Sequence, residues 1–328
     1  MRSGGSFLSL GRSRGRAAVA RRVASRVARR VARTVARTVA GLMACAALAA
    51  CAGHDAPRAP QVSDDFGDSV AAGTTSRPNR IVSLSPATTE LLFAIGAGPR
   101  VVGRTHWDVS PDSARLVPDL GAGLRPNVEA VLATHPDLVV LYASRDDRAA
   151  AAQLKAAGVP VLALRTDRIA DFRRAAILLG RATGESARAQ LCVDTVDQAL
   201  ARVRAATRSL PHPTVFWHIW DEPVITVGSG SFQSELLDIA GARNVYADDP
   251  RPSPQVSLED IVRRNPDLVL AGSLGAARIR SSAKWQAVPA VRLGHIVVVD
   301  TALVGRPSVR LGEAAAELAR LLHPGQVP

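Results

Sequence analysis

Cysteine is scarce in this chain, and the positions of its three residues do not favour disulfide bonds that would stabilise the fold. Cys45 and Cys51 belong to an unusual N-terminal segment, which leaves Cys192 alone in the rest of the sequence. A disulfide-held domain and a zinc site built from cysteines are both excluded, because each needs several cysteines. Cys192 lies at helical spacing with Val196, so we expect it to be a small buried apolar residue.

Catalytic motifs are also missing. The chain has no Gly-x-Ser-x-Gly, no phosphate-loop Gly-Lys-Ser/Thr and no His-Glu-x-x-His. Residues 228–231 read Gly-Ser-Gly-Ser, but no Lys follows, which favours a turn over a phosphate-binding loop. The seven His are scattered, and no two have the spacing of a helical metal site. We therefore expect no catalysis, no cofactor and no metal site; a two-lobed α/β transferase or reductase is the alternative.

Acidic residues are absent from the first 51 positions, which hold 11 Arg. The whole chain has a net charge of +12, but beyond residue 51 only 30 basic residues face 29 acidic ones. Binding to nucleic acid needs a basic face on the folded part, so that alternative rests on the Arg-rich segment alone. A hydrophobic content of 47% excludes general disorder.

The N-terminal segment is typical of an export signal. Residues 38–51 are uncharged and too short for a membrane span, which needs about 20 apolar residues. Their end, Leu48-Ala-Ala-Cys51, resembles the lipobox of bacterial lipoproteins. We expect a signal peptide at 1–51, a lipid on Cys51 and a flexible tether at 52–78.

This prediction places the protein outside the cytoplasm, in the periplasm or at the cell surface, held to a membrane by lipid. The alternative is a chance Ala-rich helix that ends in Cys. A twin-arginine signal at Arg21-Arg22 or Arg29-Arg30, or a start codon further downstream, would also account for the long basic region.

Residues 79–168 alternate between strands and helices. We predict strands at 80–85, 101–103, 138–142 and 160–164, and helices at 88–95, 127–133 and 148–157. The strands are short apolar runs, and Gly or Pro follows most of the helices. This alternation predicts a parallel sheet covered by helices.

The pattern returns in residues 211–324. We predict strands at 214–219, 268–271 and 296–299, and helices at 233–240 and 258–263. Residues 128–141 match residues 258–271, and Glu, Pro and Asp each recur at an offset of 130. The two halves therefore share one structural plan.

A single long helix joins the halves. Residues 185–208 contain no Gly or Pro, and their apolar residues recur every three or four positions, which predicts a helix of about 36 Å. Together with a shorter helix it makes up a connecting region, 169–210. The predicted fold is α/β, with two parallel-sheet lobes joined by one long interlobe helix. Ligands of such sheets bind beyond the carboxyl ends of the strands, in a cleft between the lobes.

Aromatic residues make up only 4% of the chain, and several stand at strand ends with a His beside them. The candidates for the cleft are His106, Trp107, Tyr142, Trp217, His218 and Trp220. Core and cleft are equally favoured for Trp217, because strand faces alternate; the cleft is favoured for the exposed strand ends. Such side chains suit a large, flat, partly apolar ligand.

Three charged residues are further candidates. Arg306, in a late loop, is expected either to hold an anionic group or to be a solvated loop charge. Glu129 and Glu259 begin equivalent short helices. They either complement the helix dipoles or form one exposed acid per lobe for docking on a two-fold partner.

The chain resembles the periplasmic solute-binding proteins of iron-chelate and cobalamin ABC importers. The resemblance lies in residues 80–91, 127–129, 135–139, 254–259 and 265–269, and it extends from about residue 80 to residue 322. It implies two α/β lobes, a rigid connecting helix and a shallow cleft. It also implies that Glu129 and Glu259 dock on the two subunits of a permease dimer, with the binding protein a monomer.

The resemblance further implies a ligand and its contacts. A cobalamin or another corrinoid is expected first, and haem or a ferric siderophore is the alternative. Ser85, Pro86 and the loop Thr301–Arg306, with Leu303 in it, join the candidate ligand contacts. His106 or His218 would serve as an axial ligand to cobalt or haem iron. The loops at 121–124 and Ser253 lack the aromatic residues that the cobalamin-binding members have there.

Overall fold

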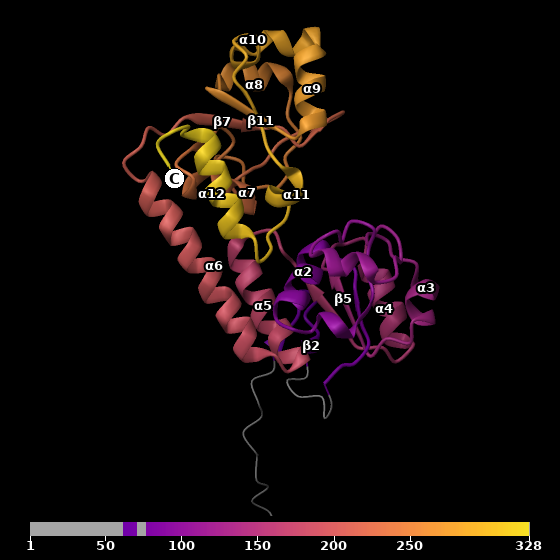
Figure 1. Cartoon of the computed structure of the whole chain (residues 1–328). Coiled ribbons are helices and arrows are strands. Elements are labelled where there is room, and N and C mark those ends of the chain that lie inside the picture. Colours follow the sequence, from indigo (N-terminus) through magenta and orange to yellow (C-terminus); the bar gives the residue numbers. More distant parts are fainter. Residues whose placement is uncertain (1–61, 71–76, 328) are drawn as a thin grey trace, which may run out of the picture. The chain divides into compact units, whose positions relative to one another are not determined.

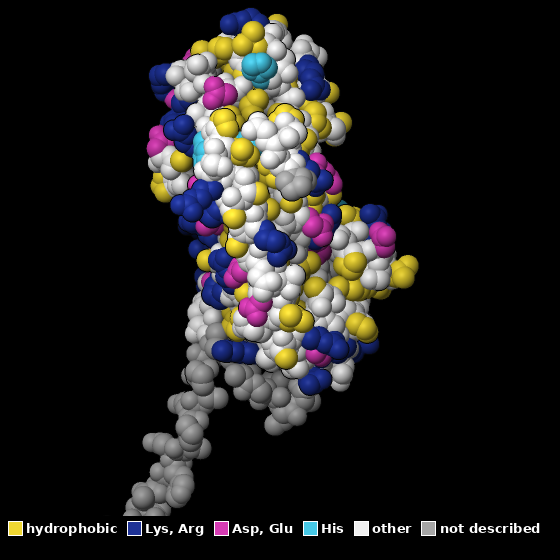
Figure 2. Space-filling view, turned by 60° about the vertical axis from the view of Figure 1, so that its left-hand side comes forward, with side chains coloured by type: hydrophobic (Ala, Val, Ile, Leu, Met, Phe, Trp, Pro, Cys, Tyr) yellow, Lys and Arg dark blue, Asp and Glu magenta, His cyan; other side chains and the backbone are white. Residues whose placement is uncertain are grey.

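The computed structural model describes residues 62–70 and 77–327. The predicted signal peptide, Cys51 and most of the predicted tether lie outside these residues. None of the described helices combines the length and the apolar character that a membrane crossing requires. Figure 2 shows Lys and Arg beside Asp and Glu over the face it presents, in keeping with the near-neutral charge beyond residue 51.

The N-terminal lobe is built on a parallel sheet with the strand order β4-β3-β5-β6. Its strands are β3 (Ile81–Ser83), β4 (Val101–Gly103), β5 (Leu138–Tyr142) and β6 (Val161–Leu164). Its helices are α2 (Pro86–Ala94), α3 (Val128–Ala133) and α4 (Arg148–Ala156), and the short 3-10 turns η1 (Gly98–Arg100) and η2 (Asp112–Leu116) flank β4. The strands are almost wholly buried and apolar, as expected for a sheet covered on both faces.

The C-terminal lobe repeats this plan with the parallel order β10-β7-β11-β12. Its strands are β7 (Thr214–Trp217), β10 (Arg243–Asn244), β11 (Leu268–Ala271) and β12 (Ile296–Val298). Its helices are α7 (Phe232–Ile239), α8 (Leu258–Arg264), α9 (Ser273–Ser281), α10 (Pro289–Arg292), α11 (Thr301–Val304) and α12 (Leu311–Leu322), with a 3-10 turn η3 (Ala283–Ala287). The prediction of two parallel-sheet lobes is confirmed.

Strand β7 is shorter than predicted. It ends at Trp217, and the chain then forms a small antiparallel hairpin of β8 (Trp220–Asp221) and β9 (Val224–Ile225). The Ile219 N–H donates to the Ile225 carbonyl rather than to the sheet, which pulls Ile219 out of β7. The hairpin stands at the carboxyl end of the sheet, where it helps to form the candidate site.

The connecting region consists of α5 (Ile169–Thr183) and α6 (Ser186–Thr207). Gly184 separates them with a left-handed φ of 74°, a conformation that glycine adopts without steric cost. Helix α6 has 22 residues, about 33 Å, and it begins and ends within one residue of the predicted helix. Its buried stripe (Ala189, Val193, Val196, Leu200 and Val203) packs into one core with residues of both lobes. Figure 1 shows α6 running beside α5 and α12.

The segment that recurs at an offset of 130 residues has the same structural role in both lobes. Asp137 accepts hydrogen bonds from the N–H groups of Asn79 and Arg80, just before β3. Asp267 accepts from the N–H and hydroxyl groups of Thr214, where β7 begins. In both lobes the Pro-Asp pair therefore ties the start of one strand to the start of its neighbour.

Residues 62–70 differ from the predicted flexible tether. They form a hairpin of β1 (Val62–Ser63) and β2 (Ser69–Val70) that is attached to the N-terminal lobe. The buried Asp64 carboxylate accepts from the N–H groups of Phe66, Asp68 and, on β6, Ala163. The strands are too short to show an alternating pattern, and a side chain rather than a run of apolar residues holds them, so composition alone suggested a tether.

Candidate functional site

The carboxyl ends of the strands carry most of the predicted site residues. In the N-terminal lobe, Ser85 and Pro86 follow β3, and residues 104–111 follow β4. In the C-terminal lobe, residues 218–221 follow β7 and residues 272–274 follow β11. Residues 301–306, which make up α11 and the turn after it, follow β12. The two sets meet, because Arg306 Nη1 lies 3.5 Å from the carbonyl oxygen of Trp107. This is the position where ligands of parallel sheets bind.

A hollow of about 550 Å³ opens at the carboxyl ends of β7 and β11. Its lining is made of Trp217, His218, Ile219, Trp220, Asp221, Gln233, Gly272, Ser273, Leu274, Gly275, Arg278, Thr301, Val304 and Gly305. Four predicted residues (Trp217, His218, Trp220 and Thr301) belong to it. Its rim exposes apolar side chains: Leu274 is 77% exposed, Trp220 56% and Ile219 42%. An exposed apolar rim of this kind marks a surface that binds something.

His106 and Trp107 face solvent in the loop after β4. Their ring centroids are 4.3 Å apart, and Trp107 is 60% exposed. The loop is held from below by Asp108, whose carboxylate accepts from the hydroxyl groups of Thr105 and Thr89, each at 2.5 Å. Burial raises the pKa of Asp108, although both hydroxyl groups lower it. The two rings are thus presented on a rigid turn.

His218 is fixed rather than free. Its Nε2 lies 2.9 Å from Asp221 Oδ1, and its ring stands edge-on to Trp285. Gly275 leaves no room on the other side, because a Cβ there would come within 2.8 Å of His218 Nδ1. Both ring nitrogens are therefore enclosed, and of the two histidines expected as axial ligands only His106 is exposed to an incoming metal.

Three other predicted contacts are drawn into the protein. Trp217 is 2% exposed and packs in the main core, although its edge lines the hollow. Leu303 packs against the same core. The Tyr142 hydroxyl donates to Asp167 at 2.6 Å; burial, and then this bond, raise the pKa of Tyr142. Trp217 and Tyr142 are the last residues of β7 and β5, and alternate side chains of a strand point to opposite faces of the sheet, so such a residue faces the interior as readily as the site. Leu303 lies in the short helix α11 instead.

Ser85 and Pro86, two further predicted contacts, lie where α2 begins. Ser85 occupies the N-cap position of α2, but its hydroxyl makes no capping hydrogen bond. Ser85 is buried, and its carbonyl oxygen accepts from the N–H of Thr89 and the hydroxyl of Thr88. Pro86 begins the helix as expected.

Arg306 is neither a solvated loop charge nor a free anion-binding group. Its Nη1 lies 3.2 Å from Oε1 of Glu90, a residue of α2 that is 2% exposed. The Arg306 side chain itself is 17% exposed. The sequence did not reveal this partner, because the two residues are 216 positions apart.

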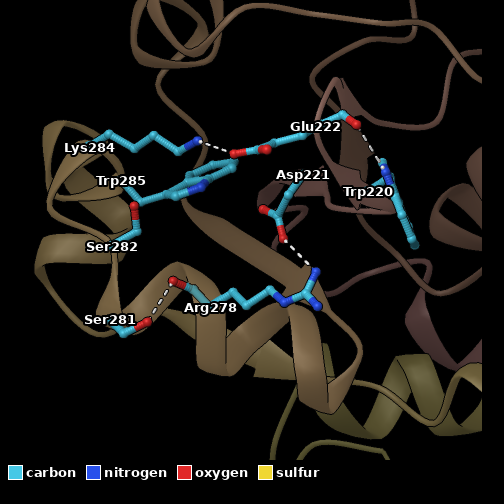
Figure 3. Close-up of a pocket in the computed structure, with 8 residues that line it drawn as sticks. All are labelled: Trp220, Asp221, Glu222, Arg278, Ser281, Ser282, Lys284 and Trp285. Carbon is cyan, nitrogen blue, oxygen red and sulfur yellow. Dashed lines mark hydrogen bonds and ion pairs between the residues drawn. The ribbon is translucent and has the colours of Figure 1, made fainter.

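A second, charged pocket of about 600 Å³ lies behind the hairpin β8–β9. It is lined by Trp220, Asp221, Glu222, Arg278, Ser281, Ser282, Lys284 and Trp285. Figure 3 shows Arg278 reaching Asp221 and Lys284 reaching Glu222, at 3.7 and 3.6 Å. We favour the first hollow as the ligand site, since it is more apolar and lies at the strand ends. The charged residues that follow Trp220 in the sequence were the available signal for this second pocket.

Glu129 and Glu259 occupy equivalent places in the two lobes. Each is exposed in the first turn of its helix, α3 or α8, behind a side-chain cap from Asn127 or Ser257. The pKa of Glu259 is lowered by hydrogen bonding to its own backbone N–H and to Ser257. Within residues 62–70 and 77–327, neither acid forms an ion pair. The same part of the chain holds no cluster of three His, Cys, Asp or Glu that would bind a metal ion.

Known proteins match this architecture. The family model described as periplasmic binding protein matches residues 81–303. The ABC transporter substrate-binding lipoprotein YvrC of Bacillus subtilis is 31% identical over 255 residues, or 75% of this chain and 81% of that protein. The vitamin B12-binding protein of Vibrio parahaemolyticus is 24% identical over 240 residues, or 73% and 87%.

A solved structure gives the same result. The periplasmic heme-binding protein from Pseudomonas aeruginosa is 25% identical, with a TM-score of 0.68 over 76% of this chain and 94% of that one. The family model, the relatives and this fold agree over both lobes. The chain belongs to the periplasmic binding protein family.

Proposed function

We propose that this protein is the solute-binding component of an ABC importer and that it captures a large, flat metal chelate between its lobes, a corrinoid first. The observation that carries the proposal is the set of exposed apolar side chains where the strand-end loops of the two lobes meet. Trp107 stands on one lobe, and Trp220 and Leu274 on the other. Stacking on indole rings is a strong way to hold a broad planar ligand.

Two of the four Trp residues are more than half exposed at this place. A protein with few aromatic residues gains stability by burying them, so their exposure points to an external partner. Leu124, which is 63% exposed, belongs to the neighbouring loop, where Gly123 packs closely on Leu84 and Thr105. The corrinoid is further supported by relatives named vitamin B12-binding protein.

Haem is the second candidate, and His106 favours it. This imidazole is exposed and lies beside Trp107, with the two rings tilted by 52°, and a neutral imidazole is a good axial ligand for iron. A structural neighbour is named as a heme-binding protein. A ferric siderophore is supported by a further neighbour, an Fe3+-hydroxamate transport protein of Saccharomonospora viridis.

The rest of the proposal concerns delivery. Members of this family are transport components rather than enzymes, so the bound solute is a cargo and not a cofactor. The chain is exported and anchored through Cys51, and it acts as a monomer that docks on a permease dimer through Glu129 and Glu259. Two exposed acids on equivalent helices suit a partner with two-fold symmetry.

The experiment is a titration of the full chain, carrying Cys51→Ser, with cyanocobalamin, haemin and ferrichrome in parallel, followed by tryptophan fluorescence. N-acetyltryptophanamide corrects for light absorbed by the ligands. Saturable quenching by the corrinoid alone supports the first candidate. Binding of haemin or ferrichrome alone replaces the ligand and keeps the importer function. A folded sample that binds none of them overturns the proposal and reopens an enzymatic function.

A further inference from the structure

Glu90 is a buried acidic residue whose carboxylate is only partly hydrogen-bonded. It lies on α2 of the N-terminal lobe, is 2% exposed, and faces Arg306 of the C-terminal lobe at 3.2 Å. Its second oxygen, Oε2, is buried without a hydrogen-bond partner. A carboxylate left half-satisfied in the interior is costly, and such a group persists where it has a task.

The pKa of Glu90 reflects opposing effects of its surroundings. Burial is the largest effect on its pKa and raises it, whereas Ser308, Arg306 and Arg310 lower it. All three of these residues come from the C-terminal lobe. The groups that favour the charged form of Glu90 therefore lie across the lobe junction, on the C-terminal lobe.

Arg306 serves both lobes at once. One nitrogen, Nη1, lies within reach of Glu90 Oε1 and of the Trp107 carbonyl oxygen, at 3.2 and 3.5 Å. Trp107 is the exposed ring that the proposed function places against the ligand. The Arg306 contact therefore links the spacing of the lobes to the position of this ring.

A second link lies elsewhere along the junction. Glu235 on α7 accepts from Arg168 Nη2 at 2.6 Å and from the N–H of Ile169 at 2.7 Å, where α5 begins. With one polar link at the connecting helices and another at the loop after α11, the lobes are held at two separate places. Two attachments fix a spacing, whereas one alone would leave a hinge.

We propose that Glu90 and Arg306 form an interlobe clamp that sets the width of the cleft and positions Trp107, so that Arg306 acts as a positioning residue and not as a ligand contact. Its effect on ligand affinity rests on the proposed function, but its effect on lobe spacing does not. A site that is already shaped loses less freedom when its ligand binds.

The test measures the distance between the lobes without any ligand. Spin labels are placed on Ala149→Cys of α4 and Ala277→Cys of α9, both exposed, in the full chain with Cys45, Cys51 and Cys192 replaced by Ser. Double electron–electron resonance (DEER) then measures the distance between the two labels in the otherwise wild-type protein, in Arg306→Met and in the double variant Glu90→Gln/Arg306→Met. Both variants are expected to give a broader or displaced distance distribution.

The double variant distinguishes loss of the clamp from misfolding caused by an unpaired buried charge. Arg306→Met leaves the buried Glu90 charge without its partner, whereas the double variant removes both charges. The matched control is Arg100→Met, since Arg100 is also 17% exposed and lies 3.1 Å from a carboxylate, that of Glu185, but away from the C-terminal lobe. This control is expected to lower stability and to leave the distance distribution unchanged.

A second measurement uses cyanocobalamin and haemin as probes. For the probe that the wild type binds, the double variant is expected to lose about tenfold in affinity, or about 1.4 kcal/mol, and the Arg100→Met control to lose none. A wild-type distance distribution in the folded double variant overturns the clamp. If neither probe binds the wild type, the proposed function fails while the distance measurement still decides the clamp.

Discussion

At the scale of single residues, the four Trp side chains divide into two kinds. Trp217 and Trp285 are at most 2% exposed and belong to the cores of the protein. Trp107 and Trp220 are exposed, yet Trp107 stands on a turn fixed by Thr105 and Asp108. A rigid exposed ring binds with little loss of side-chain freedom, which suits a site that is formed before its ligand arrives.

Trp107→Ala is expected to weaken binding of the corrinoid about 10- to 100-fold, or roughly 1.4–2.8 kcal/mol, because a stacking surface is lost. Its free energy of unfolding is expected to stay within about 0.5 kcal/mol, since the side chain is mostly exposed. Calorimetric titration and urea unfolding measure the two effects. Leu191→Ala, at an exposed apolar position on α6, is the control, and unchanged affinity in Trp107→Ala would remove this ring from the site.

His106 distinguishes the two leading ligands. If haem is the cargo, His106→Ala is expected to move the Soret band of the complex and to lower affinity, because the iron loses an imidazole. Absorption spectra of the loaded protein measure this. His212→Ala, at another exposed histidine, is the control and is expected to keep the wild-type spectrum. An unaltered Soret band in His106→Ala would show that the iron takes its ligand elsewhere.

At the scale of elements, the Pro-Asp pairs hold the sheets in register. Asp267 accepts the Thr214 N–H at 2.7 Å and its hydroxyl at 2.6 Å, and these bonds lower the pKa of the carboxyl. Hydrogen bonds to a charged group contribute about 1.5–3 kcal/mol, and solvent exposure of Asp267 reduces this to about 1 kcal/mol. The strand pair β7–β11 therefore depends on a side chain as well as on its backbone ladder.

Asp267→Ala is expected to lose about 1 kcal/mol of unfolding free energy at neutral pH. A carboxyl whose pKa is lowered by folding stabilises the protein above its unfolded pKa, near 3.8, and loses this effect as the pH falls through the folded pKa. The difference between wild type and variant should thus shrink below about pH 4. Urea unfolding at several pH values tests this, and a pH-independent difference would contradict it.

Elements with local signals were predictable, and those that depend on distant partners were not. Helix α6 was predicted to within one residue because its apolar stripe is continuous. The hairpin at 62–70 was missed, since Asp64 fixes it to a strand about 100 residues away. Glu90 was not among the predicted site residues, because its partner Arg306 follows 216 residues later and no local pattern links the two.

At the scale of the whole molecule, the two proposed docking acids lie on different lobes. Glu129 belongs to the N-terminal lobe and Glu259 to the C-terminal lobe, on helices that the repeat makes equivalent. Neither acid lines the hollow that we assign to the ligand. Ligand binding and docking on the permease would therefore use different parts of the surface, and a substitution can impair one of them without impairing the other.

The double variant Glu129→Arg/Glu259→Arg is expected to abolish transport and to leave ligand affinity unchanged. Each single variant should retain part of the transport, because one lobe still meets its permease subunit. If the acids meet basic groups on the permease, replacing them with Arg sets like charges against each other, which costs several kcal/mol and is enough to prevent docking. Uptake by cells that depend on the importer measures transport, and titration of the purified protein measures affinity.

Asp194→Arg supplies the control for charge reversal, because Asp194 is an exposed acid on α6, away from both docking helices. Transport should persist in this variant. Normal transport by the double variant would show that the acids only complement their helix dipoles. Loss of ligand affinity in the double variant would mean instead that the helices support the cleft. If the double variant loses transport but keeps wild-type ligand affinity, one acid on each lobe contacts a partner with two-fold symmetry. That result would also show that the protein uses different parts of its surface to bind the ligand and to dock on the permease.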